Sequence, residues 1–171
     1  LYVNVSVGTG KHANNPWLQE LPDPVTKICW DNYAAVSPRL AKEMELNDEQ
    51  LVMIGNFGPI PVVVQPGQQH KTISVALGYG RKNTGIPGDT IGKNAFSLVE
   101  TRNGTRQYWL DQIRLEKVPG SHPLARTQSH HSMEGRNLIR ETTLKKYLAD
   151  PASGNEARQK LSGHLKSLYE M

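Results

Sequence analysis

Two segments rich in glycine and asparagine carry residue types that can bind a phosphate or a heterocyclic base. The first spans residues 8–15, and the second is a long loop over residues 78–93 with glycine at 78, 80, 85, 88 and 92. Glycine adopts positive φ and lets backbone N–H groups approach a phosphate, and an asparagine amide offers both a donor and an acceptor. Loops this long in compact domains are usually functional or disordered. These two segments are therefore the first candidates for a binding site.

Catalytic motifs are absent from the sequence. Cys29 is the only cysteine, so it makes no internal disulfide, zinc site or iron–sulfur site, and we interpret it as a buried structural thiol. No Gly-x-Ser-x-Gly motif occurs. Gly78-Tyr79-Gly80 is not a dinucleotide fingerprint, because Pro87 and Gly88 intervene before any helix could follow. We predict no catalytic residue.

Three histidines could suggest a metal site. His130 and His131 are adjacent and point different ways on a regular element, and His122 lies in a proline-containing loop. No Asp or Glu at helical spacing completes a ligand set. We therefore predict no metal ligands and interpret these residues as part of a solvated linker or a subunit contact. A Cys-x-x-Cys-His haem attachment motif is also absent.

The positive charge lies mostly in the last third of the chain. Residues 1–120 hold 12 Lys and Arg against 11 Asp and Glu, whereas residues 121–171 hold 8 against 5. No dense basic run with interleaved aromatic residues occurs, so we predict no nucleic-acid partner. The chain begins without Met, which leads us to expect a segment of a longer polypeptide.

The elements that would position the loops are short strands with one clear helix. Ser37-Pro38 predicts a helix start, and Leu40, Ala41, Met44 and Leu46 give that helix an apolar side. Asn103-Gly104 predicts a hairpin turn. By alternation and apolar runs, strands are expected at residues 1–7, 26–35, 51–54, 60–64, 73–77, 95–101, 107–110 and 113–118.

The character of the chain changes after Pro119-Gly120, where we place the end of the domain. Residues 141–149 and 161–169 are expected to form helices within an extension that cannot build its own core. We therefore predict a β domain over residues 1–120 and a basic, partly helical linker over residues 121–171. The pattern favours a mainly β barrel with a helix inserted after the second strand.

Several segments together resemble the C-terminal domain of molybdopterin oxidoreductases. They are His12-Ala13-Asn14-Asn15-Pro16-Trp17-Leu18, then residues 38–52 from Pro38-Arg39-Leu40-Ala41 through the acidic turn, and finally Gly78-Tyr79-Gly80-Arg81 with Gly92-Lys93-Asn94. The resemblance implies a double-psi β-barrel with one or two inserted helices. It also implies that His12, Asn14, Asn15, Gly80, Arg81 and Asn94 match positions that contact a molybdopterin guanine dinucleotide. Residues 44–50 lack the glycines usual in the family's turn, which marks a divergence from catalytic members.

The sequence is most similar to the large electron-transfer subunit of alternative complex III, and this similarity includes residues 128–136 and 140–144. It implies a place on the periplasmic side of the bacterial inner membrane, in a membrane-associated quinol-oxidising complex. Implied partners are an upstream molybdopterin-like domain, a downstream iron–sulfur domain and the membrane subunits. It further implies that no molybdenum cofactor is retained.

Two functions follow from the resemblance. We favour a non-catalytic scaffold and binding domain within an oxidoreductase subunit, in which the glycine and asparagine loops serve packing. The alternative is a domain of an active molybdopterin enzyme of the polysulfide or tetrathionate reductase type, in which the same loops clamp the dinucleotide. In both cases the chain is not expected to be catalytic alone.

Overall fold

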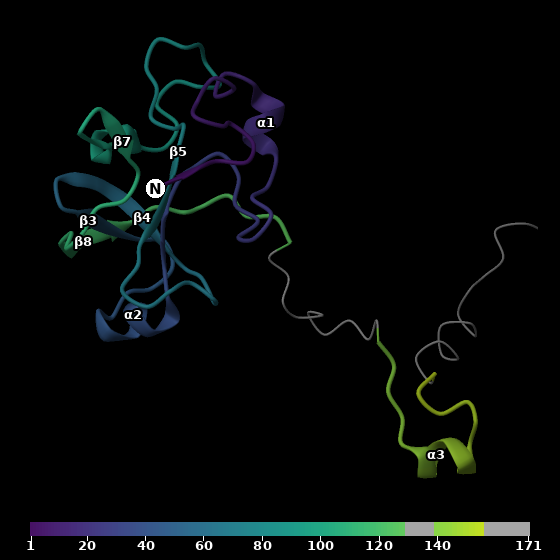
Figure 1. Ribbon diagram of the computed structural model, residues 1–171. Helices are drawn as coiled ribbons and strands as arrows, with labels where there is room; N and C mark the ends of the chain where they lie inside the picture. The colour runs from purple at the N-terminus through teal and green to yellow at the C-terminus, as the bar shows by residue number, and fades with distance from the viewer. Residues whose placement is uncertain (129–138, 156–171) are drawn as a thin grey trace, which may run out of the picture. The chain divides into compact units, whose positions relative to one another are not determined.

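The computed structural model describes residues 1–128 and 139–155, and the chain divides into two compact units, Leu1–Ser129 and His130–Met171. In the first unit, helix α2 (Pro38–Glu43) lies at one end of the sheet. Helix α1 (Pro16–Glu20) and the loop after residue 78 lie at the other end (Figure 1). Among the described residues, no helix has the length and apolar character needed to cross a bilayer.

Six strands of the first unit form one mixed sheet in the order β1-β5-β2-β4-β3-β8. Two pairs are parallel, β1 with β5 and β2 with β4, and the other pairs are antiparallel. The strands of this sheet are β1 (Tyr2–Val3), β2 (Ala34–Val36), β3 (Gln50–Ile54), β4 (Phe57–Val64), β5 (Ser74–Leu77) and β8 (Leu115–Ser121). The mainly β class predicted from the sequence is confirmed.

The sheet does not close into a barrel within the described residues, because β1 and β8 remain as its two edges. The strand expected over residues 1–7 is wrong beyond Val3. The strand ends early because of Asn4. Its side-chain Oδ1 accepts hydrogen bonds from the Ser6 and Val7 amides at 2.8 and 2.9 Å. This Asx turn competes with the strand ladder and bends the chain away from it.

The strand expected over residues 26–35 is also mostly wrong, since only Ala34–Val36 pairs in the sheet. Lys27 and Trp30 have φ of 61° and 68°. Left-handed backbone is rare for bulky residues and cannot continue a strand. The three residues of β2 are fully buried between β4 and β5, as expected for a central strand.

The predicted helix start at Ser37 is confirmed. Ser37 Oγ accepts a hydrogen bond from the Leu40 amide at 3.1 Å, and Pro38 occupies the first helical position. Together they satisfy an end of the helix that would otherwise leave unpaired N–H groups. The helix carries Ala41 into the main core and is followed by strands β3 and β4, near their predicted places.

The region after residue 94 differs in three ways from the prediction, one of which is that the strand expected over residues 107–110 ends at Gln107. The strand expected over residues 95–101 is largely a 3-10 helix, η1 (Ala95–Leu98), because Asn94 Oδ1 caps it by accepting from the Phe96 amide at 3.1 Å. The predicted Asn103-Gly104 hairpin is confirmed, with β6 (Glu100–Arg102) pairing β7 (Thr105–Gln107). Strand β8 runs on through Pro119-Gly120 to Ser121, since an edge strand tolerates proline.

Residues 122–127, here called the strap, are part of the first unit. The His122 amide donates to Glu49 O at 2.9 Å, and the Cys29 amide donates to Ala125 O at 2.9 Å. Leu124 is buried in a cluster with Ile28 and Tyr33. The strap thus covers apolar side chains that the sheet leaves open.

The second unit contains α3 (Leu144–Ala149), which confirms the helix predicted there. Thr143 caps its start, and Asp150 follows its end. The amphipathic segment predicted at residues 161–169 lies outside the described residues.

Candidate functional site

Residues 8–15 form a series of tight turns stabilised by their own backbone. The Gly10 and His12 amides donate to Val7 O, and the Asn15 amide donates to His12 O. Asn15 then caps α1, its Oδ1 accepting from the Trp17 and Leu18 amides at 3.1 and 3.3 Å. The segment is therefore a fixed structure that leads directly into a helix.

The second loop packs against the first at the end of the unit that carries α1 (Figure 1). Gly78 has φ of +103°, and a Cβ there would lie 2.6 Å from Gly8 O. Arg81 Nη2 donates to Thr9 O at 3.2 Å. A Cβ at Gly85 would lie 2.5 Å from the side chain of Asn14. The two loops singled out from the sequence thus form one surface, and glycine is what lets their backbones approach so closely.

Asn32 fixes the far end of the second loop to the sheet, and sequence reasoning missed it. Its side chain is 1% exposed. Its Nδ2 donates to Ala76 O and Lys93 O at 3.0 and 2.8 Å, and its Oδ1 accepts from the Lys93 amide at 2.8 Å. A buried amide whose donors and acceptor are all used is a strong positioning element.

A cavity of about 520 Å³, here called the loop cavity, lies between the start and the end of the second loop. Gly80 is essential to its shape, because its φ is +68° and a Cβ would lie 2.2 Å from Asn94 N. Two cationic side chains and several polar groups face it. Its lining residues are Gly80, Arg81, Lys82, Thr84, Asn94 and Phe96.

The six predicted binding residues fall into two groups. Gly80, Arg81 and Asn94 line the loop cavity together. His12, Asn14 and Asn15 lie in the neighbouring loop and are not among its lining residues. Lys82 and Thr84 line it too, although neither was singled out from the sequence. The position of Lys82 next to Arg81 in the same loop is the signal that could have identified it.

Three of these side chains are used by the domain's own backbone. The Oδ1 atoms of Asn15 and Asn94 cap α1 and η1. Arg81 donates one of its N–H groups to Thr9 O. Arg81 and Lys82 still present positive charge to the cavity, which suits an anionic group better than an uncharged base.

Buried hydroxyl and thiol groups lie beneath this end of the sheet. Burial raises the pKa of Tyr79 above its usual range, and the neighbouring Tyr33 adds to this effect. Burial likewise raises the pKa of Tyr2 and Tyr33. Burial, with a smaller effect from Glu20, raises the pKa of the Cys29 thiol, which donates to Glu20 O at 3.2 Å. These groups are therefore neutral at physiological pH and suited to structure.

The one histidine of the strap contacts a carboxylate: His122 Nε2 lies 2.8 Å from Asp31 Oδ2. Within residues 1–128 and 139–155, no three His, Cys, Asp or Glu side chains are grouped so that they could hold a metal ion. His130 and His131 lie outside the described residues.

Comparison with known proteins adds no assignment to this geometry: no protein-family model and no curated protein matches the sequence.

Proposed function

We propose that this chain is a non-catalytic scaffold and binding domain of a molybdopterin oxidoreductase-like subunit, in a membrane-bound, quinol-oxidising electron-transfer complex. The sequence resemblance supplies this context, including the periplasmic side of the inner membrane and partners in neighbouring domains and membrane subunits. In this role the surface formed by residues 8–15 and 78–94 contacts a partner domain.

The finer fold in this proposal is a double-psi-type barrel. Two features support it. The mixed sheet contains parallel pairs between strands that are not consecutive, β1 with β5 and β2 with β4. Helix α2 follows directly after β2, where the sequence pattern predicts an inserted helix.

One observation carries the choice of a scaffold: two of the three asparagines predicted to bind a base already use their side-chain oxygen within the domain. Asn15 and Asn94 use Oδ1 as helix caps, and replacing such a cap costs about 1 kcal/mol. A base that displaced the backbone amides from these Oδ1 atoms would uncap α1 and η1. The loops are therefore better suited to packing against a partner domain than to recognising a guanine or a pterin.

A second function, dinucleotide clamping, is favoured by the loop cavity. Its volume of about 520 Å³ lies within the usual range for small-molecule sites. Arg81 and Lys82 could hold the diphosphate of a molybdopterin guanine dinucleotide, and Thr84 could add a hydroxyl. Bound there, the cofactor would supply redox chemistry at a distant metal, and these residues would only anchor it.

The deciding experiment measures molybdenum, tungsten and iron in the intact parent protein from its native membranes, together with extracted pterin. The scaffold proposal expects iron without molybdenum, tungsten or pterin. Stoichiometric molybdenum or tungsten with guanine dinucleotide would overturn it in favour of the clamp.

A second experiment addresses the 171-residue chain directly, by calorimetric titration with guanosine diphosphate. The scaffold proposal expects no saturable binding tighter than about 1 mM. Binding that is weakened by Arg81→Ala but kept in the matched variant Arg106→Ala would support the clamp, because Arg106 is exposed on β7 and does not line the loop cavity.

A further inference from the structure

The main core of the first unit opens into a large cavity at a distance from the loops discussed above. Its volume is about 680 Å³, and none of its lining residues lines the loop cavity. We call it the aliphatic cavity, because most of its walls are aliphatic side chains from α2, β5, η1 and the segment before β8. Six of them are Leu40, Met44, Ile73, Leu98, Ile113 and Leu115.

These six side chains pack against the main core but are only partly buried. Protein interiors are normally filled to crystal density, and voids much smaller than this one are costly. Trp109, 57% exposed, also lines the cavity. The core is thus incomplete on this side, in the way expected of a preformed pocket for an apolar ligand.

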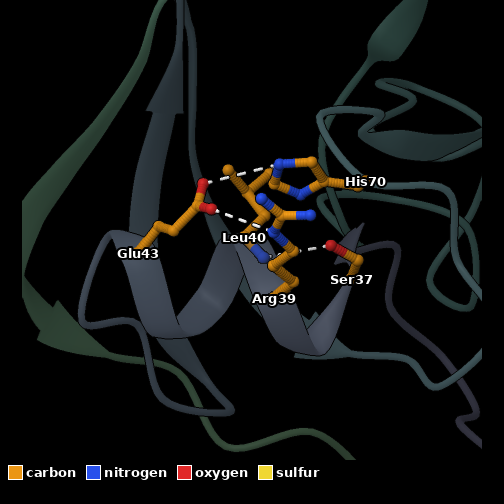
Figure 2. A network of polar contacts seen from close by, with 5 residues as sticks. All are labelled: Ser37, Arg39, Leu40, Glu43 and His70. Carbon is orange, nitrogen blue, oxygen red and sulfur yellow. Dashed lines mark hydrogen bonds and ion pairs between the residues drawn. The ribbon is translucent and has the colours of Figure 1, made fainter.

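A polar network beside the aliphatic cavity joins α2 to the segment before Lys71 (Figure 2). Glu43 Oε1 accepts from Arg39 Nε at 3.2 Å, and Glu43 Oε2 lies 3.6 Å from His70 Nε2. This network links α2, which carries Leu40 and is followed by Met44, to the segment that continues into Lys71. The contacts of Glu43 with Arg39 and His70 lie outside the cavity and do not fill it.

Two charged side chains of opposite sign line the cavity, Lys71 and Asp111. Beside it, Glu43 pairs with Arg39 and lies near His70. Lys71 itself lines the cavity, is exposed, and forms no ion pair within the described residues. An ammonium group beside an aliphatic pocket complements an anionic head group on an aliphatic chain. Because Asp111 also lines the cavity, a ligand with a cationic head group is the competitor that the titration below must distinguish.

We propose that the aliphatic cavity binds a single-chain aliphatic carboxylate, a free fatty acid. The alkyl chain lies among Leu40, Met44 and Ile113, and the carboxylate pairs with the ammonium group of Lys71. This inference does not depend on the function proposed above, because it uses a different cavity and no residue of the loops.

The test is a calorimetric titration of the 171-residue chain with dodecanoate, kept below its micellar concentration, and with dodecanol and dodecyltrimethylammonium as probes of the head group. We expect saturable binding with dodecanoate tightest and the cation weakest. Lys71→Met should weaken dodecanoate binding about tenfold, which corresponds to about 1.4 kcal/mol, and leave dodecanol unchanged. The matched variant Lys145→Met, exposed on α3, should bind as the wild type does.

A filling variant locates the site. Ile113→Trp should abolish binding, whereas Ile86→Trp, the same substitution at a side chain that is 95% exposed, should not affect it. If Ile113→Trp does not fold by circular dichroism, Leu98→Trp fills the cavity from η1 instead. The proposal is overturned by absence of saturable binding, by tighter binding of the cation, or by wild-type affinity in a folded filling variant.

Discussion

Replacing Asn32 should release the loop that forms the loop cavity, at a large cost in stability. Asn32→Ala removes three hydrogen bonds and leaves the carbonyls of Ala76 and Lys93 and the Lys93 amide without that partner. At about 1 kcal/mol for each of these groups, the loss in the free energy of unfolding is about 3 kcal/mol. Typical domains have about 5–15 kcal/mol in total, so the variant should fold but be clearly weakened.

Asn32→Asp tests the same reasoning with an isosteric side chain. The carboxylate cannot donate and would face the oxygens of Ala76 and Lys93, so we expect a loss of at least about 4 kcal/mol at neutral pH. Burial raises the folded-state pKa of this aspartate above its unfolded value of about 3.9. The neutral form of this side chain therefore favours folding. The loss in the free energy of unfolding becomes smaller as the pH falls toward 4 and larger as the pH rises through the folded-state pKa.

The assay is urea unfolding followed by circular dichroism, with tryptic cleavage at Lys82 and Lys93 as a local readout. Asn56→Asp, at an exposed turn, is the matched control and should change stability by less than about 0.5 kcal/mol. A loss in Asn32→Ala below about 1 kcal/mol, or an Asn32→Asp variant no weaker than this control, would refute the positioning role.

Three further predictions follow from the same geometry. Gly80→Ala should lower the melting temperature much more than Gly67→Ala, because both have positive φ but only a Cβ at Gly80 meets backbone atoms, whereas Gly67 has nothing within 4 Å. Equal losses in melting temperature in the two variants would show that the strain of positive φ, and not the contact made by the Cβ, determines the effect. Leu124→Ala should cost about 2–5 kcal/mol in urea unfolding, since this strap residue is 7% exposed, while Leu144→Ala, 72% exposed, should cost little. Three tyrosines have hydroxyl pKa values raised by burial, so their neutral form favours folding; that stability is complete below about pH 10 and is lost as the pH rises through their folded-state pKa values. In a spectrophotometric titration, Tyr2, Tyr33 and Tyr79 should ionise only as the protein unfolds. Ionisation of these side chains in the folded protein near pH 10 would contradict this expectation.

Local signals predicted the parts of the fold that local forces determine. Ser37-Pro38 and Asn103-Gly104 specify a helix start and a hairpin turn by themselves, and both were predicted. Asn15-Pro16 carries the same signal as Ser37-Pro38 and begins α1, a helix that we did not predict. The Pro22-Asp23-Pro24 segment that follows is incompatible with a helix only over its own residues, and α1 ends before it, at Glu20.

Other features depend on distant partners and leave no local trace. Asn32 bonds to residues 44 and 61 positions away, so its sequence neighbourhood does not reveal its role. The left-handed backbone at Lys27 and Trp30 likewise has no signal in the sequence, because neither residue type favours positive φ. Three of the six residues predicted to bind, Gly80, Arg81 and Asn94, line one cavity. The other three, His12, Asn14 and Asn15, belong to the loop beside it.

The pairing of β1 with β5 has a consequence for synthesis on the ribosome. Tyr2 cannot meet its partner Ala76 until 74 more residues have been made, and Ile28 must wait for Arg126 in the strap. At about 5–20 residues per second, the first strand stays unpaired for about 4–15 s. Its apolar residues are available to chaperones, or to another nascent chain, throughout that interval. The order in which these segments leave the ribosome, and not only the final contacts, therefore affects the risk of misassociation while this domain folds.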